Sequence, residues 1–280
     1  MDDRTLKLLE FDRVLETLSR HAECDGARGR LRATSPIADR QARALETTRL
    51  RESIARESEP GPWCHVARGE LALLLEGGER AALDGPALVQ IAEWLEAGES
   101  TRERWEDTSQ RARHTALATL ADGIVPPPGL ARRLNDSLDG DGRVRDSASP
   151  DLKRLRSELA VAERRLEARL ARYANGFGAA AYVTRHGDRF VALVPAAGFS
   201  RRTAIVHDVS ASGQSLFVEP LEMCEDNNRM LELRAAAFEE ERRILRDLRA
   251  AVLAAREPLA RLEAALVHFD ALRAAARWST

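Results

Sequence analysis

The chain has 280 residues and a mass of 31.0 kDa, enough for one large domain or two of ordinary size. With 43 basic and 45 acidic residues its formal net charge is −2, which excludes both a uniformly basic nucleic-acid-binding chain and a polyacidic disordered one. Lys7 and Lys153 are the only lysines, and neither follows a glycine. The sequence therefore lacks a G-x-x-x-x-G-K-S/T phosphate-binding loop, and we expect this chain not to be a P-loop ATPase on its own.

The spacing of the cysteines and histidines argues against two further classes, a disulfide-stabilised protein and a metal-binding protein. Cys24, Cys64 and Cys224 are odd in number and far apart, which is not the pattern of a disulfide framework. The six histidines show no spacing typical of metal ligands, so we expect no metal site. No apolar run approaches the ~20 residues that span a bilayer, and the first residues lack a signal-peptide core. We expect a cytoplasmic protein with no membrane partner.

Residues 1–149 predict a helical core domain, because apolar side chains recur there every three or four positions. We expect Asp39, which follows the break at Ser35 and Pro36, to cap a helix. Residues 84–86, Asp-Gly-Pro, are a second helix start.

Residues 150–182 predict an outgoing lever helix. Ser149 is suited to cap it, and Pro150 takes the first helical position. Apolar residues then alternate spacings of three and four, a heptad seam that indicates a coiled-coil arm: Leu152, Leu155, Leu159, Ala162, Leu166, Leu170 and Tyr173.

The pattern changes to strands over residues 183–220. Residues 183–186 and 189–195 flank Gly187 and Asp188, which is the layout of a β-hairpin with a tight turn. Two more short strands follow, at residues 203–209 and 215–219.

Residues 221–280 predict a returning lever helix and a core helix. Leu231, Phe238, Leu245 and Val252 stand seven apart as a second apolar seam. The sequence thus predicts a mainly α fold: a helical core, two long antiparallel coiled-coil lever arms, and a small antiparallel β insertion at their tip.

The charge is unevenly distributed along the chain. Residues 150–205 carry a net charge of +6, against −5 for residues 1–149 and −3 for residues 206–280. Four arginines of the basic segment lie around its turns, where side chains can reach a partner: Arg185, Arg189, Arg201 and Arg202. Their planar guanidinium groups suit phosphate oxygens. The alternative is that they only solvate the surface, as charge runs usually do.

Two other groups of polar residues contain types that catalytic or metal sites use, but neither group predicts such a site. His207 and Asp208, with Ser210 and Ser212, are the residue types of a hydrolase triad, but triad members meet through the fold and not along the chain. We assign Ser210 and Ser212 to hydrogen bonding in a turn, and Gly213 to its backbone geometry. The acidic run at residues 239–241 is followed by two arginines and indicates a salt-bridged helix face.

A longer pattern runs through the predicted tip. Residues 206–213, Val-His-Asp-Val-Ser-Ala-Ser-Gly, continue through Phe-Val-Glu-Pro at 217–220 to Asn227 and Asn228. Together with residues 9–11, 146–150 and the predicted hairpin, this pattern resembles the second branch of the MutS family. Ser215, where the family usually has threonine, is a departure from that pattern.

The resemblance implies a core, lever and clamp module that binds branched or recombination-intermediate DNA. It carries over Arg185, Arg189, Arg201 and Arg202 as DNA contacts, with Lys153 and Arg154 as weaker candidates farther from the tip. It also implies a following ATPase domain that forms a homodimer and holds ATP and Mg²⁺. We expect that domain, and the family's nuclease domain, to lie outside this chain, which needs no cofactor of its own.

Two alternatives stay open at this point. Relatives of this branch are also linked to stalled or collided ribosomes, so the lever could grip a ribosomal surface instead of DNA. The heptad seam could equally join two chains, which would make the arm purely structural.

Overall fold

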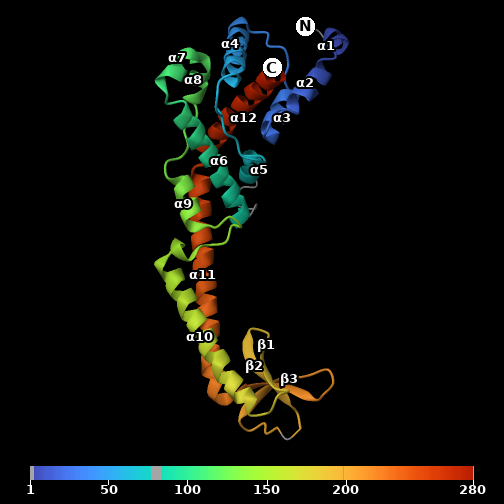
Figure 1. Cartoon of the computed structure of the whole chain (residues 1–280), viewed down its shortest axis with the longest axis vertical. Helices are drawn as coiled ribbons and strands as arrows, with labels where there is room; N and C mark the ends of the chain where they lie inside the picture. The colour runs from blue at the N-terminus through green and yellow to red at the C-terminus, as the bar shows by residue number, and fades with distance from the viewer. Residues whose placement is uncertain (1–2, 77–82, 198, 280) are drawn as a thin grey trace. The chain divides into compact units, whose positions relative to one another are not determined.

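A computed structural model describes residues 3–76, 83–197 and 199–279, which form a mainly helical protein with one small antiparallel sheet (Figure 1). The chain divides into two compact units, Met1–Val144 with Leu245–Thr280, and Arg145–Ile244. In the described residues no helix is both long and apolar enough to cross a bilayer.

The first unit is helical. Its helices are α1 (Asp3–Leu8), α2 (Phe11–Ser19), α3 (Asp25–Arg32), α4 (Arg40–Glu57), α5 (Leu71–Glu76), α6 (Gly85–Arg104), α7 (Thr108–Arg113), α8 (Thr115–Ala121), α9 (Leu130–Ser137) and α12 (Arg256–Ser279). Asp39 caps α4 by accepting a hydrogen bond from the amide of Ala42 at 2.7 Å, as its position predicted. Asp84 caps α6 in the same way through Ala87 at 2.9 Å.

Aromatic side chains from distant segments make the core of the first unit. Trp63 and Trp105 pack edge to face with ring centroids 6.4 Å apart, and Phe269 of α12 lies 5.9 Å from Trp63. The indole of Trp105 donates to the carbonyl of Trp63 at 2.9 Å, so its buried N–H is satisfied. These tryptophans are scattered in the sequence but meet in the fold.

The second unit consists of a 3₁₀ turn (Asp146–Ala148), α10 (Pro150–Asn175), the strands β1 (Tyr182–His186), β2 (Arg189–Pro195), β3 (Ala204–Val209) and β4 (Ser215–Pro220), a second 3₁₀ turn (Leu221–Met223), and α11 (Cys224–Ala254), whose last residues belong to the first unit. Ser149 caps α10 by accepting from the amide of Leu152 at 3.0 Å. The predicted cap and the two predicted strand pairs are confirmed.

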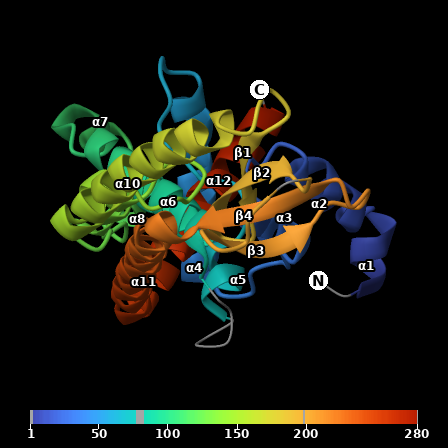
Figure 2. The same ribbon diagram turned by 90° about the horizontal axis from the view of Figure 1, so that it is seen from below.

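The strands pair in the order β1-β2-β4-β3, all antiparallel (Figure 2). Val183, Ala192, Val218 and Val206 are aligned across the four strands and point to one face. That face packs with Leu166 and other residues of α10 into the core of the unit. A bulge at His207 shifts the register between β3 and β4.

Within the second unit, α10 and the first part of α11 lie side by side and antiparallel. Arg169 pairs with Asp226 near one end, and Arg156 pairs with Glu241 at 2.8 Å near the other (Figure 1). The acidic run at residues 239–241 is a salt-bridged face, as predicted, because each glutamate pairs with an arginine.

The seam predicted for the returning helix is wrong at Phe238, whose residue surface is 59% exposed. The buried residues one position earlier are Met230, Ala237 and Ile244, which also stand seven apart. Apolar residues occupy adjacent positions along this helix, so two heptad registers were available from the sequence. Packing selects the register that leaves the larger Phe238 at the surface.

Candidate nucleic-acid interface

A buried carboxylate joins the sheet to α11. Glu219, next to last in β4, is fully buried and accepts hydrogen bonds from Arg189 Nη1 at 2.6 Å and Asn227 Nδ2 at 2.9 Å. His207 Nε2 lies 2.7 Å from its other oxygen. Asn227 in turn exchanges two hydrogen bonds with the backbone of Phe190, at 3.0 and 2.9 Å. We call these four side chains, Arg189, His207, Glu219 and Asn227, the Glu219 network.

Arg189 is therefore not the freely reaching side chain that its place beside a turn predicted. Its guanidinium also donates to Asn228, and only 30% of the side chain is exposed. The physical reason is that a buried carboxylate requires a charged partner, and Arg189 supplies it across the sheet. The same demand occupies His207 Nε2, the nitrogen that a serine triad would need.

Arg185 lies on the other face of β1. It pairs with Glu163 of α10 at 3.1 Å, and its guanidinium carbon stands 4.4 Å from the ring centroid of Phe190. Its side chain is still 48% exposed, so one side of the guanidinium faces solvent. Arg185 can therefore contact a partner through the exposed side of its guanidinium while it stays paired with Glu163. To use the whole guanidinium it must first break that pair.

Arg201 and Arg202 lie in the connection between β2 and β3 and are exposed. Within the described ranges they form no hydrogen bond or ion pair through their side chains, in contrast to Arg185 and Arg189. A guanidinium that is exposed and unpaired can bind an outside anion without first breaking an internal contact.

Lys153 and Arg154 lie in the first turns of α10. Lys153 is exposed, while Arg154 pairs with Asp151 at 3.4 Å and Glu158 at 2.9 Å. Since a helix rises ~1.5 Å per residue, about 33 Å separates them from the end of α10 that leads to β1. The structure does not bring the six predicted contacts into one patch.

The turn between β3 and β4 contains the three residues assigned to turn geometry. Ser210 Oγ accepts from the amide of Ser215 at 3.0 Å and lies 3.4 Å from Ser212 Oγ. The amide of Gly213 donates to the carbonyl of Ser210 at 2.8 Å, and Gly213 has φ +72°. Glycine adopts this left-handed conformation at little cost.

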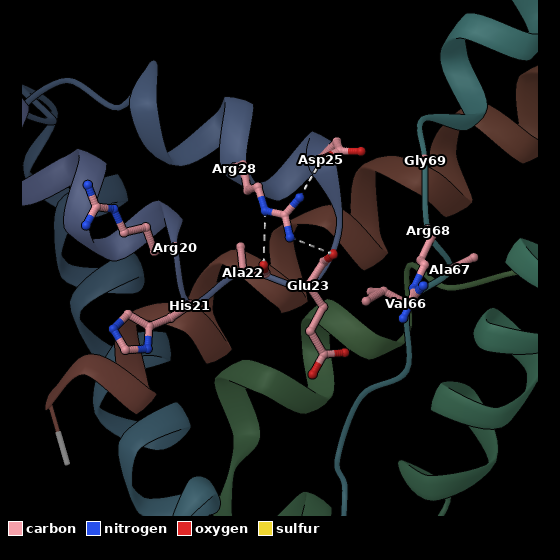
Figure 3. A pocket seen from close by; sticks show the side chains of 10 residues that line it. All are labelled: Arg20, His21, Ala22, Glu23, Asp25, Arg28, Val66, Ala67, Arg68 and Gly69. Carbon is pink, nitrogen blue, oxygen red and sulfur yellow. Dashed lines mark hydrogen bonds and ion pairs between the residues drawn. The ribbon is translucent and has the colours of Figure 1, made fainter.

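The first unit contains a surface pocket of about 580 Å³ beside the start of α3 (Figure 3). It is lined by Arg20, His21, Ala22, Glu23, Asp25, Arg28, Val66, Ala67, Arg68 and Gly69. Arg28 is held by Asp25 at 2.6 Å and by the carbonyl of Ala22 at 3.2 Å. Arg20 and Arg68 stand on opposite sides of Arg28 in this view, so the cations do not converge on one point.

Beneath this pocket the charges are already paired. Arg273 of α12 contacts Glu23 at 2.5 Å and buried Asp270 at 3.3 Å. Asp270 accepts from the amides of Glu23 and Cys24 at 2.8 and 2.9 Å. Burial raises the pKa of Glu23, but Arg273 and Arg277 outweigh burial and hold that pKa below its ordinary value. The pocket therefore presents a satisfied carboxylate, not a free acid or base.

The buried thiols do not supply a nucleophile. Burial raises the pKa of both Cys24 and Cys64 to about 12, so both are protonated at neutral pH. Across residues 3–76, 83–197 and 199–279, no group of three or more histidine, cysteine or acidic side chains is arranged to hold a metal.

Sequence reasoning missed the roles of Glu219 and Asn227. One signal was present, because Glu219 stands between Val218 and Pro220 in a strand whose other residues, apart from Ser215, are apolar. A carboxylate in such a position needs a buried partner. What could not be read from the sequence was that Arg189 and His207 would be those partners.

No protein-family model matches the chain. It is 35% identical over 287 residues to the endonuclease MutS2 of Thermomicrobium roseum, 32% over 292 residues to that of Pelotomaculum thermopropionicum, and 34% over 291 residues to that of Geobacillus thermodenitrificans. These alignments cover 99–100% of this chain but only 36% of each relative. The chain is thus similar over essentially its whole length to one part, 36% of the length, of proteins named endonuclease MutS2.

Proposed function

We propose that this chain is a DNA-binding module of a MutS2-like protein, with a core, lever and clamp organisation and no catalytic activity of its own. The observation that carries the proposal is the similarity of essentially the whole chain to 36% of each endonuclease MutS2 relative. We assign the nuclease activity in those relatives' names to the parts of them that this chain does not span. Branched DNA as substrate, an N-terminal origin and a homodimeric whole protein belong to the same proposal.

The lever in this proposal is the antiparallel pair of α10 and the first part of α11. At ~1.5 Å per residue, the 26 residues of α10 extend about 39 Å. Ion pairs along it, such as Arg234 with Glu163 at 2.7 Å, tie the two helices together. We propose that the pair behaves as a coiled-coil arm that carries the sheet as a clamp.

Arg201 and Arg202 are the leading DNA contacts in this proposal. They are exposed and have no side-chain partner among the residues that the structure describes, whereas Arg154, Arg185 and Arg189 already bind carboxylates of the same unit. Lys153 is exposed but lies at the far end of α10. Phosphate contacts by such cations release counterions, which makes the affinity fall with salt.

The test measures the affinity of the chain for a four-way junction, a duplex and single-stranded DNA over a salt series. The Arg201→Gln/Arg202→Gln variant loses two cations, so the slope of log K against log salt for a duplex should flatten by about 1.8. The matched control is Arg40→Gln/Arg51→Gln on α4, which removes the same charge from exposed positions in the first unit. We expect the control to bind like the wild type.

Two results would contradict the proposal. One is an absence of binding to all three DNAs at low salt together with co-sedimentation with ribosomes. The other is an equal loss of affinity in both double variants, because this would trace the effect to net charge and not to the tip.

A further inference from the structure

The four strands present a second face, opposite to the one that packs on α10. We call it the outer sheet face. Alternation along the strands assigns to it Tyr182 and His186 of β1, Leu193 of β2, Phe217 of β4, and Ile205 of β3. His207, at the bulge in β3, also points there, since it contacts Glu219 and the ring of His186.

Three rings on this face form one layer. The ring of His186 lies 5.5 Å from that of Phe217 and 6.0 Å from that of His207, with interplanar angles of 39° and 31°. Because β2 separates β1 from β4, these contacts require the rings to lie across β2. Val191, at the centre of β2, is accordingly fully buried. The layer is therefore broad, and its rings are closer to parallel than to edge-on.

The layer is open to solvent at both sides. Tyr182 is 56% exposed and Ile205 is 43% exposed, while His186, Leu193 and Phe217 are half-buried. The inner face offers a contrast, since Ala192, Val194 and Val218 are fully buried. The outer sheet face thus combines partly exposed apolar and aromatic side chains with the polar Thr184, Arg189 and Asp208, which makes it a candidate interaction surface.

We propose that the outer sheet face stacks the unpaired bases of single-stranded DNA, a proposal that rests on the DNA-binding function proposed above. Every base has a π-face, so flat aromatic side chains bind bases with little regard to sequence. The bases of a duplex are already stacked on one another and cannot use this surface. The face therefore selects unpaired regions, which are the regions that distinguish branched or opened DNA from a plain duplex.

The charges around the face fit a phosphate backbone. The exposed cations beside the face are Arg201 and Arg202, in the connection that leads to β3, whereas Arg189 on the face itself already pairs with Glu219. The acid buried there, Glu219, is neutralised by Arg189. Two exposed acids also border the face, Asp188 in the turn between β1 and β2, which pairs with Arg234 at 3.6 Å, and Asp208 opposite Phe217. A phosphate backbone would therefore lie on the side of Arg201 and Arg202.

The test compares the affinity of the full chain for a 2-aminopurine-labelled single strand with its affinity for the duplex of the same sequence. The variant Tyr182→Leu/Phe217→Leu keeps apolar volume but removes two rings. We expect 5- to 150-fold weaker single-strand binding, the fold change for ~1–3 kcal/mol of stacking on one base, and loss of 2-aminopurine quenching. Duplex affinity should be unchanged.

Two variants serve as controls. Phe238→Leu removes an aromatic ring that is 59% exposed on α11, away from the sheet, and should bind like the wild type. Tyr182→Phe keeps the ring and should also bind normally, which would show that the ring and not the hydroxyl group contributes to binding. Circular dichroism of each variant reports whether the fold is retained.

Three results would overturn the inference. If the double variant binds single strands as the wild type does, the proposal that bases stack on the outer sheet face is wrong, although the proposed DNA-binding function stands. If no DNA is bound at all, both proposals fail together. If RNA of the same sequence binds more tightly than the DNA strand, the commitment to DNA is wrong.

Discussion

The two units each bury a carboxylate, but they surround it with different partners. In the first unit Asp270 is fully buried, and so is its cation Arg273, of whose side chain 5% is exposed. In the second unit Glu219 is equally buried, but 30% of Arg189 and 23% of His207 remain exposed. The Asp270–Arg273 pair itself is shielded from solvent, although Arg273 also contacts the half-exposed Glu23, whereas two members of the Glu219 network are partly exposed.

This difference distinguishes a cluster that stabilises the fold from one that can also contact a partner. A shielded pair can only hold helices together, and Asp270 does so by binding the amides at the start of α3. A partly exposed network fixes its members in place while it leaves part of them available to a partner. The Glu219 network lies on the outer sheet face, where we propose that DNA binds. Four substitutions test the contrast, in order of the expected effect.

The largest effect is expected for Arg273→Met. The change leaves Asp270 as a buried charge without its cation. We therefore expect the free energy of unfolding, measured by urea denaturation, to fall by about 3–5 kcal/mol. Arg277→Met removes the same charge at a side chain that is 38% exposed, and it should cost no more than about 1 kcal/mol. Equal costs for the two variants would show that the pair is not shielded.

The next effect is expected for Glu219→Gln. The amide keeps an oxygen for Asn227 but loses its charge-assisted bonds to Arg189 and His207, which should cost about 1.5–3 kcal/mol of unfolding free energy. Since water can reach Arg189, the cost should be smaller than that of Arg273→Met. Glu222→Gln, at an exposed position three residues on, is the matched control and should be nearly neutral.

A third test uses the glutamate–histidine pair of the first unit. The hydrogen bond from His268 at 2.9 Å, opposed by burial and helped by Arg49, lowers the pKa of Glu46 from 4.5 to about 2. A carboxylate with a lowered pKa stabilises the fold above pH 4.5, and this stabilisation is lost as the pH falls from 4.5 toward 2.

The stability difference between wild type and Glu46→Gln should therefore shrink by about 1–2 kcal/mol between pH 5 and pH 2.5, after allowance for partial exposure. Urea denaturation at a series of pH values measures it. Parallel pH curves for the two proteins would mean that the pair contributes nothing to acid sensitivity.

The smallest effect is expected for Arg154→Gln. Its two ion pairs join side chains that are 40–72% exposed, so water screens both pairs and the unfolding free energy should not change measurably. Leu152→Ala, at a fully buried position two residues earlier, should cost about 2–5 kcal/mol and confirms that the assay detects a loss in α10. A measurable loss of unfolding free energy in Arg154→Gln would contradict this expectation.

Local features of the fold could be predicted from the sequence because their causes are local. Asp39 and Ser149 cap helices through amides three residues on. Gly187 supplies the positive φ of +58° in the turn between β1 and β2. The heptad register of α11 could not be fixed, since Ala237 and Phe238 are both apolar and only packing decides between them.

The charged clusters could not be predicted, because their members are far apart in the chain. Asp270 contacts Cys24 across 246 positions, and no local pattern announces that pair. For the interface, turns and charge predicted Arg189 and Arg201 alike. Strand pairing separates them, since it places Arg189 over a buried carboxylate and leaves Arg201 in an exposed loop.

The measurement that tests the central claim most directly is amide hydrogen exchange of the chain with and without a four-way DNA junction, followed by mass spectrometry. We predict slower exchange over residues 182–186 and 201–217 when DNA is bound, and unchanged exchange in α4. Slower exchange confined to the first unit would contradict the claim that the tip of the second unit holds the DNA.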